Sequence, residues 1–347
     1  MMAAIKQVYK DFGPARTIIL SFFVILCLTA WRVGLPMGGL LSDNLIRMGM
    51  NGIFVVAMVA GIACGIGLNF GLSLGILCGL IGTLVSIELD MRGVPALLFS
   101  IGFSIPLAVI VGYAYGWLLN KVKGSEMMIA TFVGFSAVSL MKIGWLVLPF
   151  KSDEMKWPIG TGIRTTISLA DRTAEILNKF LEFNIGGVTI PTGLLLSFLA
   201  TCLLMWLFMR SKAGIAMKTA GDNPRFAEAS GINVDRQRIL GTIISTVLAA
   251  VGIIVYSQSF TFLQLGEAPM FMGFLPAAAI LIGGASIRKV SMSHVLIGTF
   301  LLFGIQVVAP PVANMVSTAG NMAEISRNII SNGIIIYALT QVVSGGE

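Results

Sequence analysis

The sequence predicts an all-α fold, a polytopic transmembrane bundle of about ten helices, because apolar runs near the ~20 residues needed to span a bilayer recur along it. Of its 347 residues, 56% are hydrophobic and only 11% are charged, whereas a soluble domain has roughly 25% charged residues. The 40 glycines fit this class, since small residues let transmembrane helices pack closely. The net charge of +7 is assigned to cytoplasmic loops and not to nucleic-acid binding.

Charged residues punctuate the apolar runs and divide residues 1–347, a single transmembrane domain, into spans. No charge separates Met48 from Ile87, a stretch too long for one crossing, so a break is placed at Gly65, Gly67 and Asn69. The predicted spans are 17–35, 46–65, 68–87, 94–119, 127–149, 188–209, 239–263, 268–287, 291–311 and 328–343.

The placement of lysine and arginine predicts that both termini are cytoplasmic. Two loops are long: an extracytoplasmic loop at 150–187 and a cytoplasmic loop at 210–238. The outer loop balances its basic residues with acidic ones, whereas the inner loop is rich in lysine and arginine. The remaining connections are short, which indicates one bundle embedded in the lipid bilayer.

The inner loop contains the signals of a short helix at 224–230. Asn223 is a favourable N-cap, Pro224 suits the first helical position, and Gly231 can end the helix in a left-handed conformation. Such a helix can dock into a groove on another protein, although an ordinary capped connector would carry the same signals. The bulky and charged side chains that it would offer to a partner are Phe226, Arg225 and Glu228.

The surrounding segment, 216–232, resembles the cytoplasmic coupling motif of ABC importer permeases of the branched-chain amino acid, simple sugar and nucleoside class. The similarity lies in the Ala-Gly-Asp-Asn-Pro core at 220–224 and the Ala-Ser-Gly-Ile ending at 229–232. Segment 275–286 is similar to the apolar run of that family that ends in Gly-Gly, and segment 67–73 lies where its members carry a polar, glycine-rich helix. The residues to which the resemblance assigns coupling are Ala220, Gly221, Asp222, Asn223, Pro224, Arg225, Phe226, Glu228 and Gly231.

The resemblance covers most of the chain, from about residue 49 to 343. It implies a ten-helix permease in a bacterial inner membrane that pairs with a second permease, either a copy of itself or a paralogue. It also implies two cytoplasmic ABC ATPase subunits, an extracytoplasmic substrate-binding protein, and alternating access as the mechanism.

The substrate expected from these features is a small polar solute, and a simple sugar is predicted. Nucleosides and branched-chain amino acids are the alternatives within the class. The chain departs from the sugar permeases at three places: Gly67 and Asn69 stand where an aspartate is common, Arg288 and Lys289 follow the Gly-Gly run, and the outer loop is long.

The chain itself is predicted to carry out no catalysis. A P-loop requires a Gly-Lys pair to cradle phosphates, and the sequence contains none. ATP and Mg are therefore assigned to the partner ATPase, and no cofactor or catalytic residue is assigned to this chain. Its single histidine, His294, excludes a histidine-based metal cluster, so no metal site is predicted.

Two sets of residues inside the spans are candidates for packing and transport. Gly67, Gly71, Gly75 and Gly79 recur every fourth position and predict a close-packing stripe on one helix face. Polar side chains inside spans face protein or a water-filled cavity. The predicted translocation pathway comprises Asn51, Asn69, Ser73 and Gln258, for which hydrogen bonding between helices is the alternative.

Two other classes of function are weighed against the importer. An ion-coupled secondary transporter usually has ionisable residues near the midplane, and the candidate here is Lys142, which can instead reach the outer surface. An intramembrane enzyme needs a catalytic dyad or a metal site, and no carboxylate pair is placed inside a predicted span.

Overall fold

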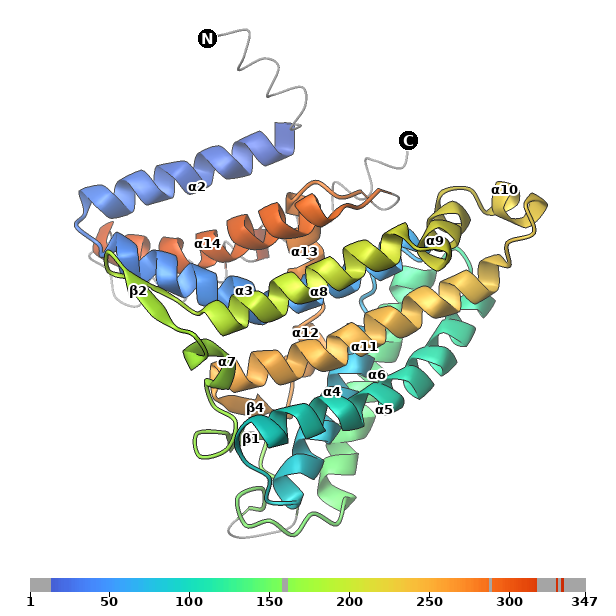
Figure 1. Cartoon of the computed structure of the whole chain (residues 1–347), viewed down its shortest axis with the longest axis horizontal. Coiled ribbons are helices and arrows are strands. Elements are labelled where there is room, and N and C mark those ends of the chain that lie inside the picture. The colour runs from blue at the N-terminus through green and yellow to red at the C-terminus, as the bar shows by residue number, and fades with distance from the viewer. Residues whose placement is uncertain (1–13, 158–161, 287–288, 317–328, 330–331, 334–347) are drawn as a thin grey trace, which may run out of the picture.

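The structure, a computed structural model, describes residues 14–157, 162–286, 289–316, 329 and 332–333 (Figure 1). The described chain is mostly helical, as expected where apolar segments must satisfy their backbone hydrogen bonds internally. The long helices lie side by side, and shorter elements join them at the two ends of the bundle (Figure 1). The main helices are α2 (Pro14–Arg32), α3 (Met37–Ala63), α4 (Leu72–Glu88), α5 (Gly93–Lys121), α6 (Glu126–Val147), α8 (Thr192–Arg210), α11 (Val234–Phe260), α13 (Phe274–Ile282) and α14 (Met292–Val316).

Six described helices are long and apolar enough to cross a membrane: α3, α5, α6, α8, α11 and α14. Three further apolar helical segments are shorter, at Thr17–Arg32, Leu72–Glu88 and Ala268–Ile282. Each of the first nine predicted spans overlaps one of these segments. The predicted span 328–343 lies almost wholly outside the described residues.

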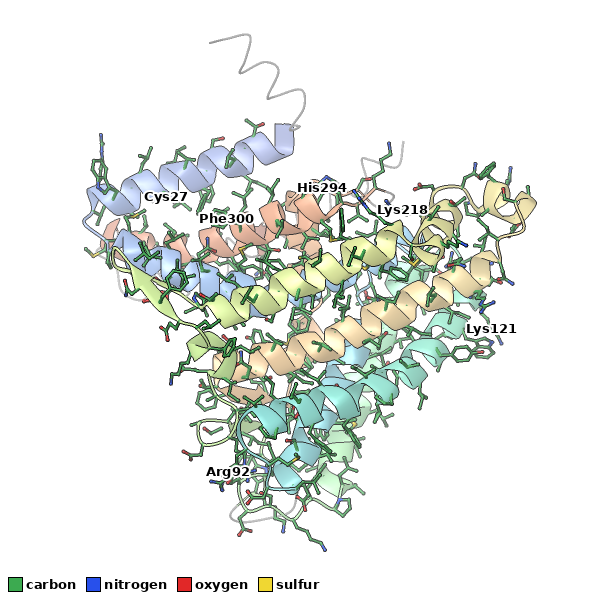
Figure 2. All side chains as sticks on the ribbon, viewed as in Figure 1. Cys27, Arg92, Lys121, Lys218, His294 and Phe300 are labelled. Carbon is green, nitrogen blue, oxygen red and sulfur yellow. The ribbon has the colours of Figure 1, made fainter. Side chains whose placement is uncertain are left out.

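The two ends of the bundle differ. The loop end carries the long loop between α6 and α8, with α7 (Ile176–Lys179) and the strands β1 (Thr166–Ser168), β2 (Phe183–Ile185) and β3 (Val188–Ile190). β1 pairs antiparallel with β4 (Phe262–Gln264), and β2 pairs antiparallel with β3. The opposite end, the α10 end, carries α9 (Lys212–Asp222) and α10 (Pro224–Ala229), which project at the right of Figure 1. Figure 2 shows Arg92, which precedes α5, and Lys121, its last residue, at these opposite ends.

Outer helices present apolar side chains to the surroundings. Leu98 and Ile110 of α5 are 62% and 70% exposed, and Leu204 of α8 is 65% exposed. A soluble protein would bury such side chains, whereas a lipid bilayer solvates them. At the α10 end, Lys121 lies 3.7 Å above the Trp117 ring, and Arg210 likewise stacks on Trp206. Tryptophan beside a cation is typical of a membrane interface.

Helix α11 lies at the centre and packs against α3, α4 and α5. Gly75 and Gly79 of α4 allow the close approach, since a β-carbon at either would collide with the Thr246 or Ala250 carbonyl of α11. The predicted stripe is nevertheless shorter than expected. Gly67 lies before α4 with φ +89° and Gly71 is its N-cap residue, so only Gly75 and Gly79 share the helix.

Several predicted boundaries are corrected by local geometry. Helix α3 begins at Met37 and not near residue 46, and 188–190 forms strand β3 ahead of α8. The span predicted at 268–287 is divided into α12 (Ala268–Phe271) and α13, and ends at Gly283 and Gly284, where φ is +98° at Gly284. Helix α14 contains Pro310 and Pro311, which supply no backbone N–H.

Candidate functional site

Helix α10 forms where the sequence places its capping signals, and it ends one residue before the predicted limit. The Asn223 side chain accepts a hydrogen bond from the Phe226 N–H at 3.1 Å, and Pro224 occupies the first turn. The Ile232 N–H donates to the Ala227 carbonyl at 2.9 Å, which requires the left-handed φ of +78° at Gly231. Both ends of this short helix are therefore fixed by its own sequence.

One side of α10 is buried and the other is open. Ala227 is fully buried and packs with Ala220, Val234 and Ile232. Phe226 is 60% exposed although it is the bulkiest side chain of the helix. The other predicted coupling residues that the structure leaves exposed are Asp222, Asn223, Pro224, Arg225, Glu228 and Gly231.

Two of the predicted coupling residues lie inside the protein. Ala220 is buried, and Gly221 packs on the end of α3, where an added β-carbon would meet the Ala63 carbonyl oxygen and lie 2.8 Å from the Gly65 nitrogen. Gly221 therefore joins α9 to the break between α3 and α4, whereas Ala220 packs against Ala227 of α10.

The turn between α5 and α6 is tied to the start of α11, directly after α10. The Lys123 ammonium lies 2.6 Å from the Asp235 carboxylate, and the Asn120 amide donates to the Asp235 carbonyl at 2.9 Å. Glu126 and Arg238 form an ion pair whose side chains are only 12% and 9% exposed. A displacement of α10 would therefore be transmitted to α5 and α6 as well as to α11.

A cavity of about 850 Å³ opens at the loop end between α3, α11, α13 and α14. On the α3 side it is lined by Asp43, Arg47 and Asn51, which recur every fourth residue and so share one helix face. On the α11 side it is lined by Tyr256, Ser259 and Phe260. Its remaining lining residues include Leu275 of α13, and Phe303, Gln306 and Pro310 of α14. Glu175 also lines it, from the loop predicted to be extracytoplasmic at 150–187, here named the outer loop.

The predicted pathway residues occupy different positions. Asn51 lines the cavity, and its amide donates to the Arg47 carbonyl at 3.0 Å. Asn69, Ser73 and Gln258 are buried and do not line this cavity. Each makes hydrogen bonds between elements, which is the alternative role that the sequence left open.

The hydrogen bonds of Asn69 join three elements. Its amide donates to Ser245 of α11 at 2.9 Å, and its carbonyl oxygen accepts from Tyr115 of α5 at 2.9 Å and from the Gly71 N–H at 3.1 Å. Ser73 similarly donates to the Pro269 carbonyl at 2.9 Å. These bonds hold the start of α4 in place.

Gln258 attaches the outer loop to α11. Its side-chain oxygen accepts from the Leu177 N–H at 3.1 Å, and its backbone carbonyl accepts from the Glu175 N–H at 2.8 Å. Glu175 has a left-handed φ of +55°, unusual for a residue with a side chain. Gln258 thereby positions Glu175 at the cavity.

Sequence reasoning missed Asp43, Arg47 and Tyr256. The predicted span 46–65 leaves Asp43 outside and has Arg47 at its start, so neither was singled out as a site residue. The spacing of Asp43, Arg47 and Asn51 was the available signal, since a four-residue repeat of polar side chains in an apolar helix indicates one polar face.

A second cluster organises the outer loop. Arg172, only 8% exposed, donates to Glu154 at 2.6 and 3.2 Å and to Asp90 at 2.9 Å. The hydrogen bonds from Arg172 lower the pKa of Glu154, helped by the positive charges of Arg172 and Arg92 and opposed by partial burial. Lys142, the candidate for ion coupling, lies 3.3 Å from Glu267.

Comparison with known proteins identifies the class. Residues 56–339 match the family described as the permease component of branched-chain amino acid transport systems. The chain belongs to this family. The resemblance inferred from segment 216–232 is thus confirmed, and this permease is a non-catalytic, multi-pass subunit of the inner membrane.

Curated relatives of the permease match over part of their length. It is 26% identical over 207 residues to the nucleoside ABC transporter permease protein NupB of Lactococcus lactis, covering 57% of this chain and 54% of that one. It is 29% identical to NupC of the same organism, over 33% of this chain and 38% of the relative. It is also 29% identical to a tyrosine transport system permease of Clostridioides difficile, over 33% and 40% of the two chains. The permease thus spans about half or less of the length of these relatives.

Proposed function

We propose that this chain is the membrane-spanning subunit of an ATP-driven importer of nucleosides. Two of the relatives are named as nucleoside permeases and one as a tyrosine permease. The simple sugar expected from the sequence has no support among them. Nucleoside import, an alternative within the same class, therefore replaces it.

The observation that carries the coupling part of the proposal is the exposure of Phe226 on a helix whose other side is buried. Helix α10 is capped at both ends, so it holds the exposed side chains of Phe226, Arg225 and Glu228 on a rigid backbone. A rigid aromatic anchor that fills a pocket on a partner is a common source of binding energy. The proposed partner is an ABC ATPase subunit that binds ATP and Mg and receives α10 in a groove.

The structure suggests how motion at α10 would reach the cavity. Gly221 contacts the end of α3, and earlier turns of α3 carry Asp43, Arg47 and Asn51. The 27 residues of α3 extend about 40 Å at 1.5 Å per residue, so this one rigid element links the two ends. In an alternating-access cycle, ATP-driven movement of α10 would tilt α3 and open or close the cavity.

Three further proposals concern topology and the other partners. The α10 end would face the cytoplasm and the loop end the outside. A substrate-binding protein would deliver solute to the loop end, and a second permease would pair with this one.

The test is recovery of the ATPase with tagged permease from native membranes in mild detergent. Phe226→Asp should abolish co-purification and ATP-dependent nucleoside uptake, because it places a charge in an apolar contact. Phe183→Asp is the matched control, since Phe183 is 45% exposed at the loop end, and it should retain the ATPase. Uptake that needs an ion gradient and no ATPase would instead establish a secondary transporter.

A further inference from the structure

We propose that the 850 Å³ cavity is the nucleoside-binding site, with the base stacked on Tyr256 and Phe260 and the ribose hydroxyls bound by Asp43. This inference rests on the proposed function and assigns it to particular side chains. The cavity has two chemically different walls, and each matches one part of a nucleoside.

The aromatic wall belongs to α11. The rings of Tyr256 and Phe260 lie with centroids 5.5 Å apart and planes 23° apart, and both line the cavity. Nucleobases stack on flat aromatic faces whatever their hydrogen-bonding edges. This wall therefore favours a solute with a planar ring and tolerates different bases.

The polar wall belongs to α3. Asp43 and Arg47 are exposed and line the cavity one helical turn apart, and in the described part of the chain neither belongs to an ion pair. A carboxylate has two acceptor oxygens, so Asp43 can accept from both hydroxyls of a ribose; acidic residues of dinucleotide-binding folds bind the ribose 2′-hydroxyl in this way. The guanidinium of Arg47 supplies donors for the carbonyl or ring-nitrogen acceptors of a base.

Charge at the cavity favours an uncharged solute. Asp43 lies one helical turn from Arg47, and Glu175 is ion-paired with Lys179 at 2.8 Å, so the charges at the lining balance. A neutral nucleoside leaves this balance unchanged, whereas a phosphate group would add negative charge beside Asp43 and Glu175. Uridine monophosphate should therefore bind more weakly than uridine.

An aromatic amino acid is the rival occupant, because its ammonium and carboxylate would complement Asp43 and Arg47. The size of the cavity favours the nucleoside: a base and a ribose together fill more of 850 Å³ than one phenol ring with a small polar group. The experiment therefore includes tyrosine as a probe.

The test is equilibrium binding to the permease–ATPase complex in nanodiscs, without binding protein, using uridine, 2′,3′-dideoxyuridine, uridine monophosphate and tyrosine. Uridine should bind about tenfold more tightly than the dideoxy analogue, the effect expected for hydrogen bonds to a charged group. Asp43→Asn should abolish most of this preference, whereas Asp153→Asn, an exposed carboxylate of the outer loop, should not change it.

The aromatic wall is tested separately. Phe260→Leu should weaken uridine and dideoxyuridine binding equally, about tenfold, because stacking does not involve the ribose. Phe262→Leu is the control, since Phe262 packs against Phe260 with centroids 6.2 Å apart but does not line the cavity.

The outcomes separate the two proposals. Tight tyrosine binding that Asp43→Asn abolishes, with no uridine binding, would overturn the nucleoside site. Nucleoside uptake by the whole importer that neither Asp43→Asn nor Phe260→Leu affects would overturn the cavity assignment and leave the proposed function standing. Absence of nucleoside uptake by the unaltered importer would overturn the function itself.

Discussion

Gly221 of α9 packs directly against Gly65, a left-handed residue just after α3. A β-carbon at Gly221 would lie 2.8 Å from the Gly65 nitrogen and 3.1 Å from the Ala63 carbonyl carbon. The contact joins two backbones, so no side-chain rotation can relieve an added atom. It makes α9 and the end of α3 parts of one packed unit.

Gly221→Ala should therefore destabilise the permease by about 1–3 kcal/mol, the usual cost of overpacking. The measurement is thermal unfolding in detergent. Gly102→Ala is the control, because a β-carbon at this position of α5 would have no neighbouring atom within 4 Å and alanine favours a helix. Equal melting temperatures for the two variants would contradict the packing at Gly221.

Loss of the cap on α10 should weaken coupling without disturbing the bundle. Asn223→Ala removes the acceptor of the Phe226 N–H, at a cost of about 0.5–2 kcal/mol to a helix end. Hydrogen exchange at residues 224–230 should accelerate, and ATPase binding should weaken. Asn223→Ser retains an acceptor and should behave like the unaltered protein; faster exchange in both variants would exclude the cap as the cause.

Asn69→Leu should lower stability more than it lowers solute binding. The substitution removes the hydrogen-bond partner of the buried Tyr115 hydroxyl and of Ser245. Each buried polar group left without a partner costs about 1–3 kcal/mol of stability. A lower melting temperature with unchanged uridine affinity in the folded fraction is expected. Unchanged stability with lost transport would instead support the pathway role first predicted for Asn69.

The outer loop should loosen in acid through Glu154. Its pKa is lowered from the ordinary 4.5, chiefly by the hydrogen bonds from Arg172. A carboxylate whose pKa is lowered in the folded state stabilises that state. This contribution is complete above the pKa of the group in the unfolded chain, and it is lost as the pH falls through the pKa in the folded protein. Because Glu154 is 47% exposed, the contribution is below about 1 kcal/mol.

Pepsin cleavage of the loop, measured below pH 4.5, tests this prediction. Cleavage should increase as the pH falls, and Glu154→Gln should show rapid cleavage throughout. Asp153→Asn, which alters a neighbouring exposed carboxylate, should follow the unaltered protein. A pH dependence that survives in Glu154→Gln would assign the effect to another group.

Local signals in the sequence predicted part of this molecule. Helix α10 could be located because Asn223, Pro224 and Gly231 determine it within a few residues, and the apolar runs located helices because each run is continuous. The break before α4 was likewise indicated by its glycines.

The remaining features of the fold and of the candidate site depend on tertiary contacts that composition does not encode. Tyr115 and Asn69 are 46 residues apart, and their hydrogen bond exists only because α5 packs beside the start of α4. Asp43 lies outside the predicted span 46–65, yet a helix can carry charge into a bundle when that face lines a cavity. The close contact of Gly221 with the end of α3 also depends on tertiary packing alone.

The prolines of α14 give the cavity walls unequal stiffness. Pro310 lines the cavity and Pro311 follows it, so this part of α14 lacks two of the backbone bonds that keep a helix straight. The α3 wall, from Met37 to Ala63, contains no proline. The α3 wall of the cavity is thus rigid, whereas α14 can bend at its prolines. The volume of the cavity can therefore change as α14 bends, while the polar face of α3 keeps its shape.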